Sequence, residues 1–416
     1  MKTSILLITG AVATATATFT SFATNGDDLI GVGPISRAMG GVGVAAPQDA
    51  ISAVFANPAA MCFTPGCAYS EVNFAGTLFM PQTSARETLG PNTFAADSKQ
   101  NVYAIPAIGL SVPIDPVTRR WRFGLAAYGV TGLGVDYRGT PIESSQLPGS
   151  FSSLMIMKFA PSVSYQALPN LSFGAAFHID YATLDLGNGS SPTYGFGGQL
   201  GVLWQPVPKL SVGLTYITPQ STTFDNVIKY PTGATSYDWR NLELQSPNTV
   251  GLGIAYSFFE DRLLTEVDGK YLNWGGATGY KDFGWQDQWV VGVGLQFAAI
   301  PHKLFVRAGY NYGKNPVRVN NGWNPDPNDM TTGHNVQGSY FPPVAYESFR
   351  LIGFPAVVEH HLTAGIGYAF SEKFEVNAGY MHAFSNDISE ESAGSYATLQ
   401  STLSEDSAEF GITWRF

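Results

Sequence analysis

The residues best suited to chemistry are few and scattered along the 416-residue chain. Glu359, His360 and His361 are adjacent, but consecutive residues of a strand point to opposite faces, which keeps the two imidazoles from one metal ion. His178 and Asp180 could share a face, as a hydrolase relay requires, but no serine motif accompanies them. The sequence therefore predicts no catalytic residues and no metal site, with a hydrolase as the weaker alternative.

Two further classes of ligand are disfavoured. Residues 41–46 match the glycine spacing of a dinucleotide-binding loop, but no strand precedes them, and such a loop must follow a strand. The net charge of −10 would repel a phosphate backbone, and no basic stripe is evident. We therefore expect no cofactor and no nucleic-acid partner.

The first 23 residues have the pattern of an export signal. Lys2 precedes an apolar stretch that ends in Ser21-Phe22-Ala23, and we place cleavage after Ala23; a buried first helix is the alternative. Export would place Cys62 and Cys67 in an oxidising compartment, which favours a disulfide between them. A metal or redox pair is the other interpretation, although the C-x-x-C spacing and further ligands are missing.

The composition suits strands that have one apolar and one polar face. Charged residues make up 13% of the chain, whereas glycine (46), tyrosine (20) and phenylalanine (27) are abundant. After the N-terminus there is no run of about 18 apolar residues that could form a membrane helix. Alternation with period two recurs from about residue 68 to the end, as in Trp289 to Phe297, which favours a transmembrane β-barrel over a soluble β-sandwich.

About fourteen antiparallel strands are predicted, an even number as expected of bacterial barrels. They lie near 68–80, 101–113, 119–137, 152–168, 170–187, 193–205, 208–220, 240–258, 261–274, 285–299, 302–314, 356–370, 372–386 and 403–416. Short turns alternate with long loops, as in outer-membrane barrels. The long loops are expected at 81–100, 138–151, 221–239, 275–284, 315–355 and 387–402.

Charged residues fall on the polar face of these strands, where we expect them to point into the barrel because a charge facing mid-bilayer lipid costs about 2–4 kcal/mol. Most should form a network that fills the lumen. Lys158 and Arg307 could instead contact a ligand carboxylate. The charged set is Arg122, Lys158, Glu243, Glu266, Asp268, Lys270, Arg307, Glu375, Glu409 and Arg415.

The segment before the first strand resembles a known family. It contains Arg37-Ala38-Met39-Gly40-Gly41, followed by Asn57-Pro58-Ala59, and is similar to the N-terminal hatch of the FadL/TodX outer-membrane transporters of fatty acids and aromatic hydrocarbons. Residues 132–137 resemble the third strand of that family, and residues 246–256, 306–312 and 361–368 resemble its later strands. The terminal Phe416 fits the aromatic residue that barrel-assembly machinery reads. The likeness covers nearly the whole mature chain except the long loops.

The resemblance implies a hatch at 24–61 within a barrel at 62–416, in the outer membrane of a Gram-negative cell. It further implies passive uptake of a hydrophobic ligand, which leaves sideways through a gap at a kinked third strand. Gly129, Gly132 and Gly134 lie on that strand, where glycine favours a bulge; ordinary barrel curvature is the alternative interpretation. The expected partners are the ligand and outer-membrane lipid and lipopolysaccharide, and the expected state is a monomer.

The loop at 315–355 is unusually apolar, which fits either ligand capture or simple packing over the barrel mouth. The residues concerned are Phe341, Tyr346, Phe349, Leu351 and Phe354. A general diffusion porin remains the alternative function, but a hatch would obstruct its pore.

Overall fold

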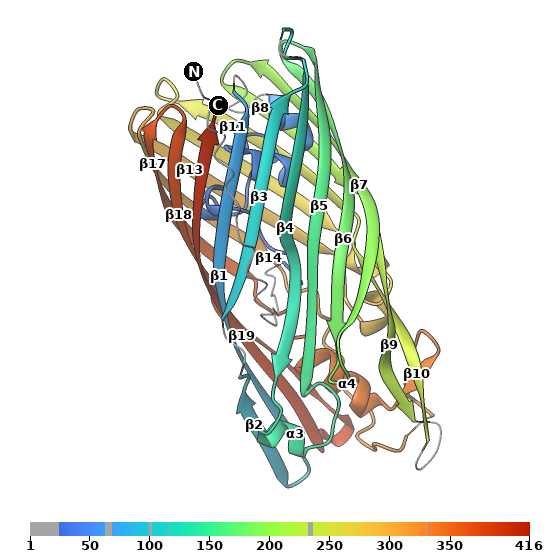
Figure 1. Ribbon diagram of the computed structural model, residues 1–416. Coiled ribbons are helices and arrows are strands. Elements are labelled where there is room, and N and C mark those ends of the chain that lie inside the picture. The colour runs from blue at the N-terminus through green and yellow to red at the C-terminus, as the bar shows by residue number, and fades with distance from the viewer. Residues whose placement is uncertain (1–24, 63–68, 100–101, 116, 232–235, 330) are drawn as a thin grey trace, which may run out of the picture.

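A closed antiparallel barrel is the main feature of the structure (Figure 1). It closes because the first strand pairs with the last, from Glu71 opposite Arg415 to Leu89 opposite Ala397. Fourteen strands form the closed wall, and a further short strand joins only the outer part of the first, which confirms the predicted fold class. The computed structural model describes residues 25–62, 69–99, 102–115, 117–231, 236–329 and 331–416.

The elements fall into two groups. The barrel strands are β1 (Glu71–Leu89), β3 (Tyr103–Pro113), β4 (Trp121–Asp136), β5 (Phe151–Leu168), β6 (Leu171–Asp185), β7 (Ser191–Val207), β8 (Leu210–Ile217), β11 (Thr249–Phe258), β12 (Leu263–Leu272), β13 (Gln288–Ile300), β14 (Leu304–Gly313), β17 (His360–Ser371), β18 (Phe374–Glu391) and β19 (Ala397–Arg415). The other elements are α1 (Pro34–Ala38), α2 (Ala50–Ala56), η1 (Pro58–Cys62), β2 (Asn92–Asp97), α3 (Pro141–Ser144), β9 (Gln220–Pro231), β10 (Tyr237–Ser246), η2 (Trp274–Gly276), η3 (Lys281–Phe283), β15 (His334–Val336), β16 (Ser339–Phe341), α4 (Pro343–Ile352) and η4 (Ala393–Ser395).

The two faces of the wall differ as the alternating sequence predicts. On β1, Phe74 and Leu78 are 50% and 52% exposed on the outside, whereas Asn73 and Thr77 are 2% and 8% exposed. The same outward apolar surface recurs around the barrel, and strands of this kind place their apolar face against lipid tails. No described helix is long and apolar enough to cross a membrane.

The charged residues mostly follow the prediction that they face the lumen. Arg122, Glu266 and Asp268 are each 1% exposed, and Glu375 and Glu409 are each 4% exposed. Glu243 differs from the expectation, because it lies on β10, which pairs only with β9 outside the barrel wall.

Several strand limits differ from the sequence prediction. The expected strand 240–258 is two strands, because β10 pairs with β9 to form a separate hairpin, and β11 alone joins the wall. Much of the expected loops 221–239, 81–100 and 387–402 is also strand, in β9–β10, β1–β2, and β18–β19. These stretches extend beyond the apolar band, so they lack the alternation that lipid imposes and that marked the other strands.

Residues 25–61, here called the N-terminal segment, lie inside the barrel (Figure 1). Nearly all of their side chains are buried. Two short helices and a 3-10 turn shape the segment, and Asp49 caps α2 by accepting the backbone N–H of Ser52 at 2.8 Å. This segment therefore occupies much of the lumen at its level.

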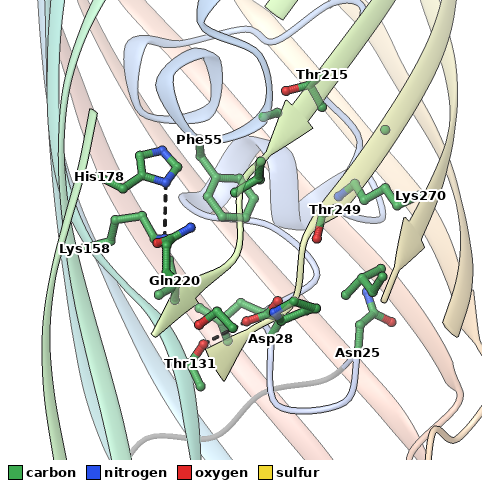
Figure 2. A pocket seen from close by; sticks show the side chains of 18 of the residues that line it. Asn25, Asp28, Phe55, Thr131, Lys158, His178, Thr215, Gln220, Thr249 and Lys270 are labelled. Carbon is green, nitrogen blue, oxygen red and sulfur yellow. Dashed lines mark hydrogen bonds between the residues drawn. The ribbon is translucent and has the colours of Figure 1, made fainter. Parts of the chain in front are cut away.

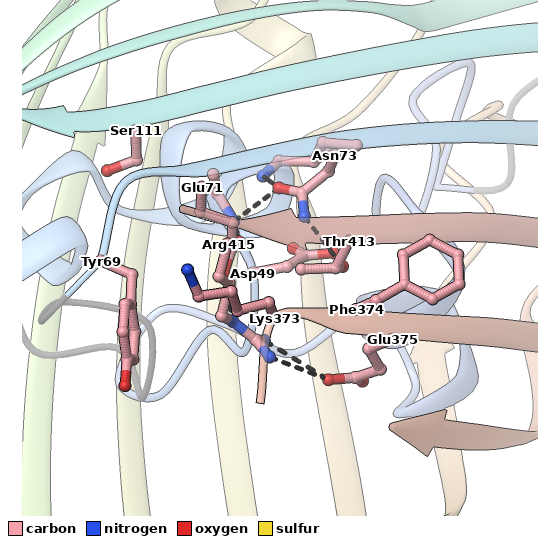
Figure 3. A network of polar contacts seen from close by, with 12 residues as sticks. Asp49, Tyr69, Glu71, Asn73, Ser111, Lys373, Phe374, Glu375, Thr413 and Arg415 are labelled. Carbon is pink, nitrogen blue, oxygen red and sulfur yellow. Dashed lines mark hydrogen bonds and ion pairs between the residues drawn. The ribbon is translucent and has the colours of Figure 1, made fainter. Parts of the chain in front are cut away.

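One polar network joins the barrel seam to the N-terminal segment (Figure 3). Arg415 on β19 donates to Glu71 on β1 at 2.9 Å and to Glu375 on β18 at 3.3 Å. The backbone N–H of Ala50 donates to Glu71 at 2.8 Å and to Asn73 at 3.0 Å. Closure of the barrel and the position of α2 thus depend on the same buried side chains.

Candidate functional site

One cavity, here called the main cavity, lies in the lumen beside the N-terminal segment (Figure 2). It contains about 830 Å³ of space not filled by atoms, including the part that opens to solvent. Its apolar lining includes Leu29, Val44, Phe55, Tyr128, Val130, Ile217 and Leu272. Its polar lining includes Asn25, Asp28, Thr131, Lys158, His178, Thr215, Gln220, Ser246, Thr249 and Lys270. The cavity can therefore take a molecule that has apolar and polar parts.

Lys158, which the sequence singled out, extends from β5 into this cavity. Its ammonium lies 3.2 Å from Asp180 and 3.3 Å from Nδ1 of His178, both on β6, and it donates to Gln220. The structure thus brings His178 and Asp180 together, but around a lysine. A buried cation held by one carboxylate can also attract an anionic ligand.

Asp28 and Lys270 are two further charged groups of the cavity. Asp28 accepts a hydrogen bond from Thr131 at 2.8 Å, and Lys270 donates to the backbone oxygens of Ile30 at 3.4 Å and Gly41 at 3.3 Å. The sequence placed Lys270 on the lumen face but did not single out either residue as part of a site. Asp28 lies in a segment without periodicity, so no sequence signal could have identified it.

The main cavity borders the point at which β4 stops pairing with its neighbour β3. The two strands pair from Pro113 opposite Arg122 only as far as Ala107 opposite Tyr128. One residue later β4 bulges, since Gly129 faces Met157 but Thr131 faces the adjacent Ile156, which leaves Val130 unmatched. Between these two described strands, residues 103–106 and 129–136 are therefore not paired with each other.

Residues 27–29 of the N-terminal segment pair with part of the β4 edge that β3 does not pair with. The N–H of Leu29 donates to the oxygen of Val130 at 3.0 Å, and the N–H of Gly132 donates to the oxygen of Asp27 at 3.3 Å. Asp28 and Thr131 form an isolated antiparallel bridge between these bonds. This edge of β4 is thus paired with residues 27–29 rather than with the barrel wall.

The three glycines predicted to form a gate lie on the part of β4 that is not paired with β3. A Cβ on Gly129 would lie 2.6 Å from the side chain of Ile105 on β3, and one on Gly134 would lie 2.3 Å from the oxygen of Ser152. Gly132 donates its N–H to the N-terminal segment, as above. Close approach of the Ser152 backbone accounts for Gly134, and the side chain of Ile105 leaves little room at Gly129. The role of these glycines as a gate stays a prediction.

A second, smaller cavity of about 340 Å³ lies near α4, at the end of the barrel that carries the long loops (Figure 1). Phe354, from the apolar loop, contributes to its lining. Its other walls are Leu242, Leu244, Tyr280, Phe283, Trp285 and Arg350. Almost all of this lining is apolar, as a site for a hydrophobic molecule requires.

The other predicted loop residues surround this cavity without being exposed. Tyr346 and Leu351 are buried on α4, and the ring of Phe349 lies 5.2 Å from that of Phe283 and 5.1 Å from that of Phe354. Phe341 is half-buried at the end of β16. These side chains are therefore packed together rather than exposed, and their role in capture stays a prediction.

Arg307 lies elsewhere in the lumen. It donates to Gln296 and Asn377, at 2.6 Å each, and lies 3.6 Å from Glu375. It does not line the described cavity around Lys158. The structure does not bring the two predicted carboxylate contacts together.

The residues of the predicted hatch motif contact the barrel closely. Arg37 pairs with Glu409, and Asn57 donates to the oxygen of Val202 at 3.1 Å. Gly40 and Gly41 have φ values of 70° and 76°, which favour glycine. Pro58 and Ala59 lie in η1, beside Gly174 of β6.

The predicted export signal and the predicted disulfide concern residues that the structure does not describe. The export signal, Cys67 and the side chain of Cys62 lie outside the described residues. Within the described residues, no three histidine, cysteine, aspartate or glutamate side chains are grouped to hold a metal ion.

Comparison with known proteins agrees with the fold. The toluene transporter TodX of P. putida has a TM-score of 0.65 at 18% identity, over 94% of this chain and 99% of that one. A FadL homologue of Pseudomonas aeruginosa has a TM-score of 0.64 at 14% identity, over 96% and 100%. The CymD monoaromatic hydrocarbon channel has a TM-score of 0.60 at 17% identity, over 95% and 99%. No curated protein sequence matches the chain.

A family model described as outer membrane protein transport protein (OMPP1/FadL/TodX) matches residues 10–253, more than half of the chain. The match includes Arg37-Ala38-Met39-Gly40-Gly41 and Asn57-Pro58-Ala59, on which the resemblance was first based. Together with the closed fourteen-stranded barrel and its apolar exterior, this places the protein in the outer membrane of Gram-negative cells. The chain belongs to the FadL/TodX family of outer-membrane transport proteins.

Proposed function

We propose that this protein takes up small hydrophobic compounds passively and releases them sideways into the membrane between β3 and β4. The observation that carries this proposal is that Tyr128, Val130 and Thr131 line the main cavity at the point where pairing with β3 ends. A direct path into lipid spares the ligand about 0.8 kcal/mol for each CH₂ group that an aqueous exit would expose. This path needs no energy source.

Capture would occur first at the smaller cavity beneath α4. Its aromatic walls, which include Phe283 of η3 and Phe354, offer an apolar surface close to the outer mouth. The ligand would then move to the main cavity, where Lys158 could contact a carboxylate if the ligand carries one. The relatives named above as toluene and monoaromatic hydrocarbon channels, and as a FadL homologue, support a hydrophobic ligand.

The N-terminal segment would act as a hatch that blocks an open aqueous pore. Its backbone N–H groups donate to barrel carboxylates, as at Gly43 and Asp268 (2.9 Å) and at Ala45 and Glu266 (2.7 Å). These bonds fix the segment across the lumen, which argues against a general diffusion porin. An enzyme is not proposed, because the family consists of transport proteins.

Deletion of Val130 tests the side exit. Without this extra residue, Gly129 and Thr131 would face Met157 and Ile156 in regular register, so β4 could straighten toward β3. We expect cells carrying this variant to lose uptake of radiolabelled toluene and decanoate while the protein remains a heat-modifiable barrel in the membrane.

The matched control is deletion of Ala299, which relieves a similar irregularity between β13 and β14. Ala299 does not line the cavity, so uptake should stay at the wild-type level. Normal uptake after deletion of Val130 would refute the side exit. A large, steady ion current through the wild-type protein in planar bilayers would favour the porin instead.

A further inference from the structure

The charges of the main cavity are incompletely matched. Lys158 has Asp180 as a direct partner, at 3.2 Å. Lys270 forms no ion pair within 4.0 Å among the residues that the structure describes, and its two contacts are the neutral backbone oxygens of Ile30 and Gly41. Lys270 is half-buried, and an ammonium that is partly removed from water without a close carboxylate partner attracts an anion.

Asp28 is the acidic group that faces both lysines across the cavity (Figure 2). Both lysines stabilise its charged form, although neither forms a close ion pair with it. The carboxylates of Glu266 and Asp268 lie near Lys270, but they accept N–H groups of residues 43–46 and do not line the cavity. Among the described residues that line the cavity, Asp28 therefore supplies the negative charge opposite Lys158 and Lys270.

The position of Asp28 connects this charge to the edge of β4. Its carboxylate accepts from Thr131, and the residues on either side of it pair with Val130 and Gly132. Movement of the Asp28 side chain away from the lysines would thus disturb the same three-residue contact that occupies the gap beside β4.

We propose that Asp28 is an internal counter-ion, which the acidic head group of the transported molecule replaces, and that this exchange releases residues 27–29 from β4. The proposal rests on the uptake function proposed above and specifies its ligand as an amphiphile with one negative charge. The head group would lie between Lys158 and Lys270, and the apolar part would contact the apolar lining, which includes Phe55.

The test compares decanoate with methyl decanoate, which has a similar apolar chain but no charge, by titration calorimetry on the purified full-length protein. Asp28→Asn removes the competing charge, so decanoate should bind about tenfold more tightly, as expected for loss of a charged contact, while the ester should change little. Lys270→Gln should weaken decanoate binding by a similar factor.

Asp185→Asn is the matched control. Asp185 lies at the end of β6, does not line the cavity, and its carboxylate accepts from the N–H of Gly187 at 2.8 Å. It should leave the affinity for decanoate at the wild-type value. As a second readout, decanoate but not its ester should speed hydrogen exchange at the amides of Leu29 and Gly132.

The possible failures are distinct. If the wild-type protein binds neither compound, the proposed uptake function itself is refuted. If it binds the ester, while Asp28→Asn changes the affinity for decanoate no more than Asp185→Asn does, the counter-ion role is refuted and uptake stands. Equal protection of the Leu29 amide with and without decanoate would refute the release of residues 27–29.

Discussion

Arg37 of the N-terminal segment donates from Nε to Oε1 of Glu409 on the last barrel strand, at a distance of 2.7 Å. Both side chains are almost completely buried, and Arg37 also donates to Ser407 at 2.8 Å. Helix α1 is in this way joined to strand β19, and the two paired residues are 372 positions apart. A substitution in this pair can therefore test how firmly the N-terminal segment is attached to the barrel.

Replacement of Arg37 by glutamine should loosen that attachment. The change leaves the carboxylate of Glu409 buried without its cation, which costs about 3–5 kcal/mol. We expect a lower temperature of heat modification on gels and a larger ion leak in planar bilayers. In the exposed pair of Arg138 and Asp136, the same substitution at Arg138 should cost at most about 1 kcal/mol. Equal effects of the two substitutions would contradict the prediction.

Asn57→Ala should also raise ion leakage. Its side chain donates to the oxygen of Val44 at 2.8 Å and of Val202 at 3.1 Å, and accepts from the N–H of Ala59 at 3.1 Å. Each buried group left without a partner costs about 1–3 kcal/mol. Planar-bilayer conductance measures the effect, with the exposed Asn188→Ala as control. An unchanged current would show that this side chain does not hold the segment in place.

Barrel glycines that touch the N-terminal segment should not tolerate alanine. A Cβ on Gly309 would lie 2.2 Å from the nitrogen of Gly40, a separation that backbone atoms cannot accommodate without moving. Gly309→Ala should therefore displace the segment and increase its cleavage by protease. Gly76→Ala, where nothing lies within 4 Å of the new Cβ, should behave as wild type. Equal cleavage of both variants would argue against this close packing.

The pH dependence of ligand binding should report on Asp28. Burial, the largest cause, raises the pKa of Asp28 from 3.8 to about 6, while the Thr131 hydrogen bond and the lysines oppose the rise. As the pH falls from 8 to 6, Asp28 gains a proton in a growing part of the molecules and competes less with an anionic ligand, while decanoate itself stays ionised. Calorimetry should show tighter binding of decanoate at pH 6 than at pH 8 in the wild type, and a smaller change in Asp28→Asn. The same pH response in both proteins would exclude Asp28 as its source.

Loss of an aromatic wall beneath α4 should slow capture. Phe354→Ala removes one side of the smaller cavity and should lower the rate of toluene uptake at low concentration, with a smaller effect near saturation. Phe370→Ala is a suitable control, because that ring is 65% exposed on the barrel exterior. A reduction that is equal at all concentrations would indicate a defect in the amount of protein rather than in capture.

The sequence by itself determined the wall of this protein. Lipid outside and a polar lumen inside impose strict alternation on each strand, as in Asn73 and Phe74, so the strand number and the direction of most charges could be predicted. The N-terminal segment was recognisable from Arg37 and Asn57 because its close contacts constrain residue type.

Only the tertiary structure decided what meets at the site. Asp28 and Lys270 are 242 positions apart, and the end of pairing between β3 and β4 depends on register, which the residue pattern of either strand does not encode. The hairpin β9–β10 was missed for a related reason, since strands beyond the membrane lose the alternation that lipid imposes. Local pattern reflects the surroundings of each residue, whereas a cavity depends on which distant residues the closed barrel brings together.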